Sequence, residues 1–105
     1  MKKFKDLIKT PEYWQENIQN ELFRQLTDYM EKTGKSQSRI AKDLKVSKSY
    51  VSQILNGNFN FTLNKLIELS LYMGKVPDFN FISPESYISK VNSISRKNEY
   101  FASVG

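Results

Sequence analysis

The chain has 105 residues, 39% hydrophobic and 13% aromatic, which allows one domain with a modest core and rules out wholesale disorder. It contains no cysteine and no histidine, which excludes disulfides and cysteine-ligated zinc and removes the commonest catalytic bases and nucleophiles. We therefore expect no metal, no cofactor and no enzyme activity. No apolar run approaches the roughly 18 residues that span a bilayer, so we expect a soluble, cytoplasmic protein without a membrane partner.

The net charge of +5 is unevenly distributed along the chain. Residues 1–10 carry four lysines against one aspartate, and residues 11–34 carry five acidic against two basic residues. Residues 35–57 carry five basic residues against Asp43 alone. An acidic segment followed by a basic one suggests a molecule with one face turned toward an anion, although a solvated charged surface explains the charge equally well.

A basic arm at residues 1–11 leads into a long helix at residues 12–33. Thr10 and Pro11 are typical of a helix N-cap and a first helical position, and Gly34 is typical of a stop. Apolar side chains recur at every fourth residue and give this helix a stripe: Trp14, Ile18, Leu22 and Leu26.

Three shorter helices are expected next, capped in turn by Ser36, Ser47 and Thr62. The second ends at Asn56-Gly57 and the third at Gly74. The apolar residues that give them helical periodicity are, in order, Ile40, Ala41 and Leu44; Val51, Ile54 and Leu55; and Leu63, Leu66, Ile67 and Leu71.

From residue 75 onward the pattern changes. The stretch 76–82 is typical of an extended segment, and Ser83-Pro84-Glu85 opens a weaker helix with a polar, frayed tail after about Arg96. The predicted fold is therefore all-α, with four helices around one core at residues 12–74. A short C-terminal extension at residues 75–105, an extended segment plus a weak helix, is a possible dimerisation element.

The first two of the short helices form a helix-turn-helix from about Ser36 to Gly57. Ala41 lies where these helices cross, and a larger side chain there would push them apart. Val46 anchors the turn in the core, and Ser47 caps the following helix while keeping its first turn slim. Two short helices joined in this way are typical of proteins that lay a helix into the major groove of DNA.

The segment QSRIAKDLKVSKSYVSQILNG, residues 37–57, resembles the Cro and phage-repressor type of helix-turn-helix, often called the XRE family. The resemblance extends over residues 12–74 and implies a compact, four-helix, lambda-repressor-like domain that binds double-stranded DNA. Lys45 is a departure, because many members have glycine in this turn. A left-handed backbone there would cost a lysine about 1 kcal/mol.

The resemblance also implies roles for individual residues. Bases are read from the exposed side of the helix that starts at Ser47, which indicates Lys48, Ser49 and Gln53, with Ser52 next; these side chains can pair with guanine or adenine. Gln37 is expected to hold a phosphate at the start of the preceding helix. Further candidate phosphate-binding residues are Ser47, Tyr50, Arg39, Asn58, Asn60 and Thr62, and Lys35 and Lys42 add positive charge. Tyr50 is equally well explained by packing on the first helix.

These expectations favour a transcriptional regulator, a repressor that binds DNA as a homodimer. The domain also resembles that of helix-turn-helix antitoxins, which repress their own operon and neutralise a toxin partner. Residues 76–95, including Tyr87, would then cover that partner or a second copy, or they would simply cap the helical domain. The long acidic helix at residues 12–33 is a further candidate dimer surface. The plainest alternative is a small helical bundle whose serines and glycines are only caps.

Overall fold

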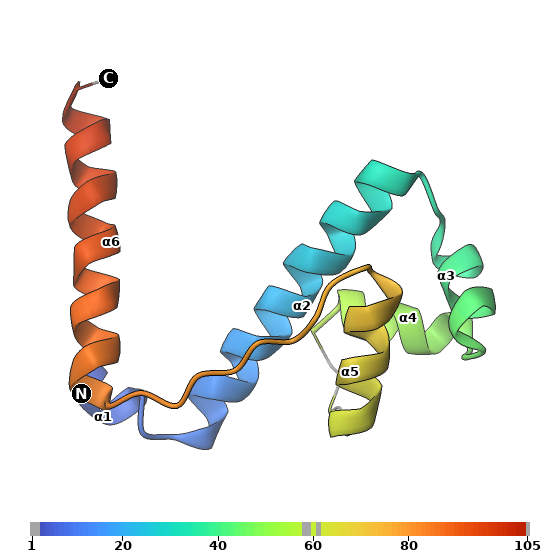
Figure 1. The fold of residues 1–105 in the computed structure, drawn as a ribbon, viewed down its shortest axis with the longest axis horizontal. Coiled ribbons are helices and arrows are strands. Elements are labelled where there is room, and N and C mark those ends of the chain that lie inside the picture. The colour runs from blue at the N-terminus through green and yellow to red at the C-terminus, as the bar shows by residue number, and fades with distance from the viewer. Residues whose placement is uncertain (1–2, 58–59, 61, 105) are drawn as a thin grey trace. The chain divides into compact units, whose positions relative to one another are not determined.

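The computed structural model describes residues 3–57, 60 and 62–104, with side chains described as far as residue 94. Within these ranges the chain is all-α, as predicted, and has no strand (Figure 1). The helices are α1 (Phe4–Leu7), α2 (Pro11–Thr33), α3 (Gln37–Leu44), α4 (Lys48–Leu55), α5 (Leu63–Tyr72) and α6 (Pro84–Val104). Among the described residues, none of the helices combines the length and the hydrophobicity that a transmembrane span requires.

The chain forms two compact units. The central unit contains residues 14–78, and the terminal unit contains residues 1–13 and 79–105. The central unit therefore holds most of α2 together with α3, α4 and α5, while α1 and α6 belong to the terminal unit.

One apolar core holds the central unit together. The buried cluster contains two residues each from α2, α3 and α4, one from α5, and Met73 just after α5: Leu22 and Leu26, Ile40 and Ala41, Val51 and Ile54, Leu69, and Met73. Leu26, Ile40 and Val51 are fully buried. Burial of side chains of this size contributes roughly 1.5–3 kcal/mol each, so this cluster fixes how α3 and α4 lie on α2.

Polar caps set the helix starts in the central unit, as the sequence predicts. Ser36, Ser47 and Thr62 all have extended backbone angles, and each accepts a hydrogen bond from the backbone N–H three residues later. The N–O distances are 3.1, 3.0 and 3.2 Å respectively. The helices of the predicted helix-turn-helix thus begin at defined residues.

The terminal unit contains an aromatic cluster that joins its two ends. The hydroxyl groups of Tyr13 and Tyr87 are 2.8 Å apart, and the ring of Phe4 lies 6.1 and 6.3 Å from those two rings. Tyr87 therefore contacts residues of its own unit, namely Tyr13 at the start of α2 and Phe4 in α1. Ser83 accepts a hydrogen bond from the Ser86 N–H at 3.1 Å and opens α6 as predicted.

Two features of the terminal unit differ from the sequence expectation. The short helix α1 lies inside the predicted basic arm, where its single turn is too brief to give a periodic signal. Helix α6 continues to Val104, beyond the end expected near Arg96. Residues 97–104 contain neither proline nor glycine, so no residue there enforces a stop.

Candidate functional site

The turn between α3 and α4 has a left-handed residue at its centre. Lys45 has φ 59° and ψ 44°, and among the described residues it is the one non-glycine residue with positive φ. Its N–H donates to the carbonyl of Lys42 at 3.2 Å, and the Val46 N–H donates to that of Ala41 at 2.9 Å. This pair of bonds is a Schellman ending, which usually takes glycine at the left-handed position. The Lys45 side chain itself is exposed.

One side of α4 faces solvent. Lys48, Ser49 and Gln53 are exposed and Ser52 is half-buried, whereas Val51 and Ile54 face the core. None of the four polar side chains has a hydrogen bond or ion pair within the described residues. The four residues predicted to read bases therefore lie together on the accessible side of one helix.

The candidate phosphate-binding residues are more dispersed. Gln37 is the half-buried first residue of α3, and Thr62 caps α5. Asn60 is exposed, whereas Asn58 lies outside the described residues. Tyr50 packs against the core, where burial raises the pKa of its hydroxyl. The ring of Tyr50 therefore contributes to packing of the core.

Most basic side chains of the central unit already have partners. Five of them form ion pairs with carboxylates: Arg24, Lys32, Lys35, Arg39 and Lys65. Lys75 donates a hydrogen bond to Gln25. Over the described residues of this unit, Lys42, Lys45 and Lys48 are exposed and unpaired. Unpartnered positive charge is thus concentrated at the end of α3, in the turn and at the start of α4. The sequence does not indicate Lys45 as a candidate DNA contact, because its position suggests only a turn.

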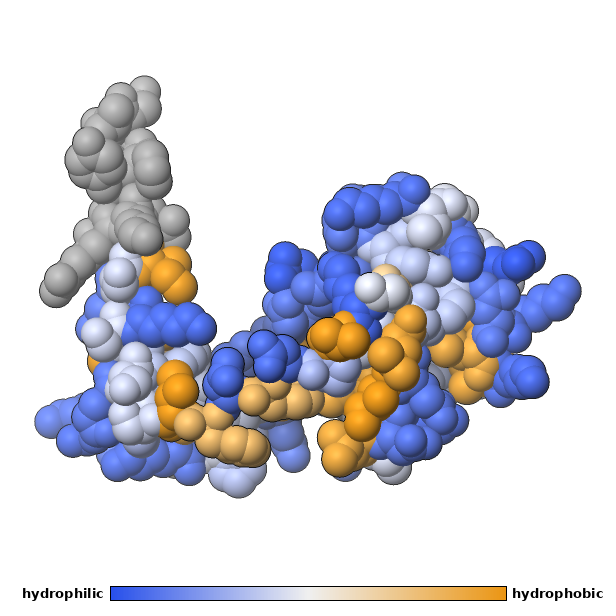
Figure 2. Space-filling view, viewed as in Figure 1, coloured by the Kyte–Doolittle hydropathy of each residue, from blue (hydrophilic) through white to orange (hydrophobic). Residues whose placement is uncertain are grey.

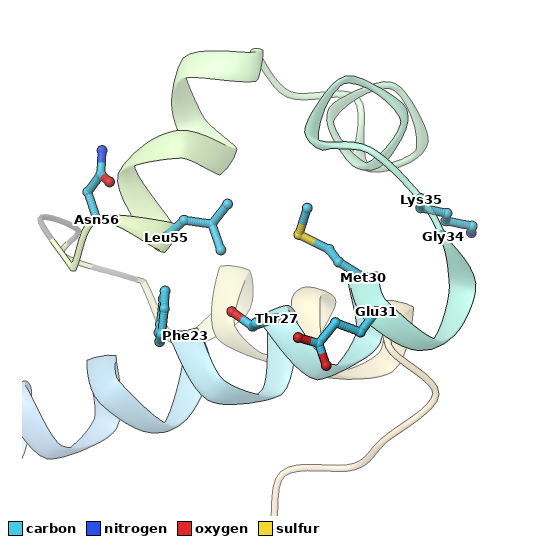
Figure 3. Close-up of a pocket in the computed structure, with 8 residues that line it drawn as sticks. All are labelled: Phe23, Thr27, Met30, Glu31, Gly34, Lys35, Leu55 and Asn56. Atoms are coloured by element: carbon cyan, nitrogen blue, oxygen red, sulfur yellow. The ribbon is translucent and has the colours of Figure 1, made fainter.

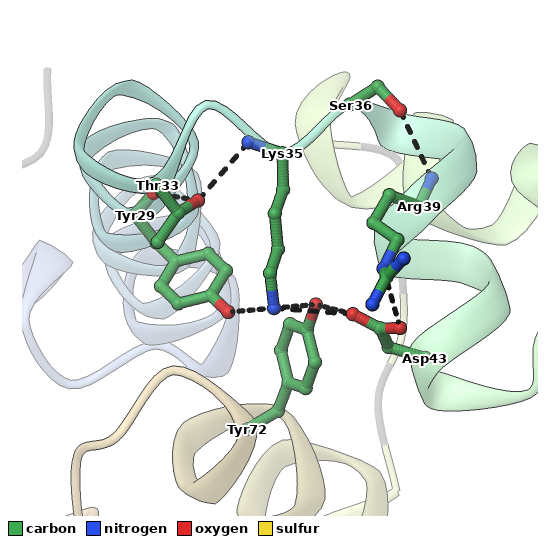
Figure 4. A network of polar contacts seen from close by, with 7 residues as sticks. All are labelled: Tyr29, Thr33, Lys35, Ser36, Arg39, Asp43 and Tyr72. Carbon is green, nitrogen blue, oxygen red and sulfur yellow. Dashed lines mark hydrogen bonds and ion pairs between the residues drawn. The ribbon is translucent and has the colours of Figure 1, made fainter.

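Lys35 is part of a polar network instead (Figure 4). Its ammonium group donates to Tyr29 Oη at 3.0 Å, Asp43 Oδ2 at 3.3 Å and Tyr72 Oη at 3.4 Å. The Tyr72 hydroxyl donates to the same Asp43 oxygen at 2.6 Å, and Arg39 Nε lies 3.0 Å from Asp43 Oδ1. These contacts tie α3 to the C-terminal end of α2 and to α5.

The network shifts the ionisation of its members. The hydrogen bond from Tyr72, together with the one from Lys35, lowers the pKa of Asp43 despite partial burial. The hydrogen bonds to Tyr29 and Tyr72 raise the pKa of Lys35. Burial and its bond to Asp43 raise the pKa of Tyr72, whereas the bond from Lys35 lowers that of Tyr29. Lys35 is accordingly a cation that holds the fold together through three side chains.

An open groove separates α2 from the C-terminal end of α4 (Figure 3). It has a volume of about 520 Å³, and Phe23, Met30 and Leu55 form its apolar part, with Glu31 and Asn56 among its polar residues. The exposed side of α4 that carries Lys48 and Gln53 does not contribute to its lining.

Comparison with known families finds a model described as helix-turn-helix that matches residues 26–79. The match begins in the second half of α2 and includes α3, α4 and α5 in full. Neither the curated proteins nor the solved structures yield a significant match.

Proposed function

Because this chain belongs to the helix-turn-helix family of the Cro and phage-repressor type, a family of DNA-binding regulators, we propose that it is a sequence-specific transcriptional repressor. It binds double-stranded DNA as a homodimer and represses by occupying the site.

The distribution of unpaired lysines is the observation that carries this proposal. Lys42, Lys45 and Lys48 lie along the α3–turn–α4 segment, while every other cation among the described residues of the central unit has a partner. DNA binding gains free energy by releasing counterions when lysines and arginines contact phosphates. A surface with unpaired cations beside an exposed helix suits that role.

Base reading is assigned to the exposed side of α4. Lys48 can donate to guanine O6 and N7, Gln53 can pair with adenine, and Ser49 and Ser52 can pair with either. Gln37 and the N-terminus of α3 hold a phosphate, with Ser47, Arg39, Asn60 and Thr62 as further phosphate ligands. The Ser47 hydroxyl oxygen caps α4, and its O–H proton stays available as a donor.

A mobility-shift experiment on sequences selected from random DNA tests this assignment. Gln53→Ala should relax the sequence preference, because each base contact discriminates by roughly 1–3 kcal/mol. Gln37→Ala should weaken binding to all sequences alike, because a phosphate contact carries no sequence information. Salt-insensitive binding that neither substitution changes would refute groove docking by α4.

A homodimer would place two copies of α4 on successive turns of the major groove, about 34 Å apart. The selected sequences should then contain two inverted half-sites with about 10 base pairs between their centres. A single asymmetric half-site, bound by a monomer in sedimentation, contradicts the dimeric part of the proposal.

An antitoxin that regulates its own operon is the second candidate. The observation that favours it is the exposure of three apolar residues ahead of α6: Phe79, Phe81 and Ile82. A toxin would cover them. The test is coexpression with the product of the adjacent reading frame: a stable complex that Phe81→Ser disrupts supports this candidate, and separate elution of the two proteins rejects it.

A further inference from the structure

Helix α5 has two apolar faces, and the core uses one of them. Leu66, Leu69, Tyr72 and Met73 belong to the core or pack against it. Leu63, Ile67 and Leu71 lie on the other face at intervals of four residues, and none of them belongs to that cluster. We name these three residues the α5 stripe.

The α5 stripe is accessible to solvent. Leu63 is 68% exposed, Leu71 is 58% exposed and Ile67 is half-buried. Figure 2 shows a continuous hydrophobic band along this helix. Side chains at positions i, i+4 and i+8 follow one side of a helix, and contiguous exposed apolar surface of this kind is typical of an interaction site.

We propose that the α5 stripe is the homodimer interface, where it packs antiparallel on the same stripe of a second copy. Because its three residues are evenly spaced, two antiparallel copies of the stripe can place all three positions in register. A two-fold axis at Ile67 sets Ile67 against its counterpart and Leu63 against the second copy's Leu71. Such self-complementarity is what a two-fold interface requires.

Charge also favours a second copy as the occupant. The charged residues of α5 are Lys65 and Glu68, which form an ion pair at 3.4 Å, so the helix is neutral in a chain of net charge +5. Two copies can thus meet here without like charges facing each other. The same compact unit carries α4, so this axis also relates the two DNA-reading helices.

The stripe is short. Stable interfaces bury about 800 Å² on each partner, which three side chains do not supply. We therefore expect a weak dimer in free solution and a marked preference for two half-sites over one. This inference rests on the proposed dimeric DNA-binding function, so its tests also examine the protein without DNA.

Disulfide trapping tests the geometry, because the native chain has no cysteine. Ile67→Cys should form a covalent dimer under mild oxidation, since its Cβ lies beside its counterpart at the axis. Leu63→Cys and Leu71→Cys should each stay monomeric alone and crosslink when mixed. Ile94→Cys, at an exposed position on α6, is the control. Failure of Ile67→Cys to crosslink, or crosslinking of Leu63→Cys with itself, would overturn the antiparallel arrangement.

DNA binding supplies a second readout. Leu63→Gln combined with Leu71→Gln should leave thermal unfolding and single half-site binding unchanged, because both residues lie outside the core. Affinity for paired half-sites should fall by about tenfold or more, as the avidity of the dimer is lost. Full retention of that avidity would overturn the proposed interface. If the unmodified chain itself does not bind DNA, the proposed function is refuted instead.

Discussion

At residue 45 the backbone adopts a conformation that side chains other than glycine rarely take. The left-handed region brings Cβ close to the carbonyl oxygen of the same turn, which costs about 1–2 kcal/mol. The two hydrogen bonds of the Schellman ending and the packing of Val46 against the core offset that strain. The angle between α3 and α4 is thus maintained at the expense of stability.

Replacement of this lysine should release the strain. Lys45→Gly should raise the free energy of unfolding by about 1 kcal/mol. The control is Lys42→Gly, which removes the same charge from the interior of α3 and should lower that free energy by about 1 kcal/mol. Thermal and urea unfolding measure both. A loss of stability in Lys45→Gly would show that the side chain matters more than the backbone angle.

Asp43 is the acidic centre of the polar network, and its lowered pKa fixes the sign of a pH effect. The folded state favours the ionised carboxylate, so its stabilisation is present above the ordinary aspartate pKa of about 3.9 and is lost as the pH falls through the lower folded value. Asp43→Asn should therefore lower the thermal midpoint by a few degrees at pH 7, with a difference that shrinks below about pH 4. Asp78→Asn, an exposed aspartate of the same unit, is the control; equal pH profiles for both variants would contradict the role of Asp43.

Among the elements, α1, α6 and the first turn of α2 depend on the aromatic cluster of the terminal unit. The hydrogen bond with Tyr87, together with burial, raises the pKa of Tyr13 to about 12. A tyrosine whose pKa rises on folding stabilises the fold below pH 10, and that stabilisation is lost as the pH rises toward 12. The contact between these hydroxyl groups should therefore be visible in an alkaline titration.

Tyr87→Phe keeps the ring and removes the hydroxyl partner. The pKa of Tyr13 should fall from about 12 toward 10. Tyrosinate absorbance between pH 9 and 13 reports the change, and a parallel titration of Tyr13→Phe assigns it among the six tyrosines. An unchanged titration would mean that the two hydroxyl groups do not interact in solution.

The elements of the central unit follow from local chemistry, which explains why the sequence predicts their boundaries. Caps and glycine stops act within four residues, so Ser36, Ser47, Thr62 and Gly74 could be identified one at a time. The sequence could not predict which face of α5 is buried, because leucines lie on both sides of this helix with equal periodicity. Packing alone selects Leu69 for the core. The network of Lys35 likewise joins residues up to 37 positions apart, a distance over which sequence pattern gives no signal.

For the whole molecule, the position of the charge matters more than the total. Substitution of Lys42, Lys45 and Lys48 by glutamine lowers the net charge from +5 to +2, and so does substitution of Lys32, Lys65 and Lys75. The first triple variant should reduce the slope of log affinity against log salt concentration by about 2–3 units, or roughly 0.9 for each lost phosphate contact. The second should change it little, because its lysines have intramolecular partners. Equal slopes would mean that DNA is attracted by net charge alone.

The polar network around Lys35 also has a consequence for chemical modification. Acylating reagents attack the neutral amine, which is rare in a lysine whose pKa is raised. The ammonium group also lies 5.5 and 5.0 Å from the ring centres of Tyr29 and Tyr72, and its hydrogen bonds to both hydroxyl groups and to Asp43 must break before the amine can react. Acetylation should therefore modify Lys42, Lys45 and Lys48 well before Lys35. Under the proposed function, an acetylated chain would lose its affinity for DNA while its fold stayed intact.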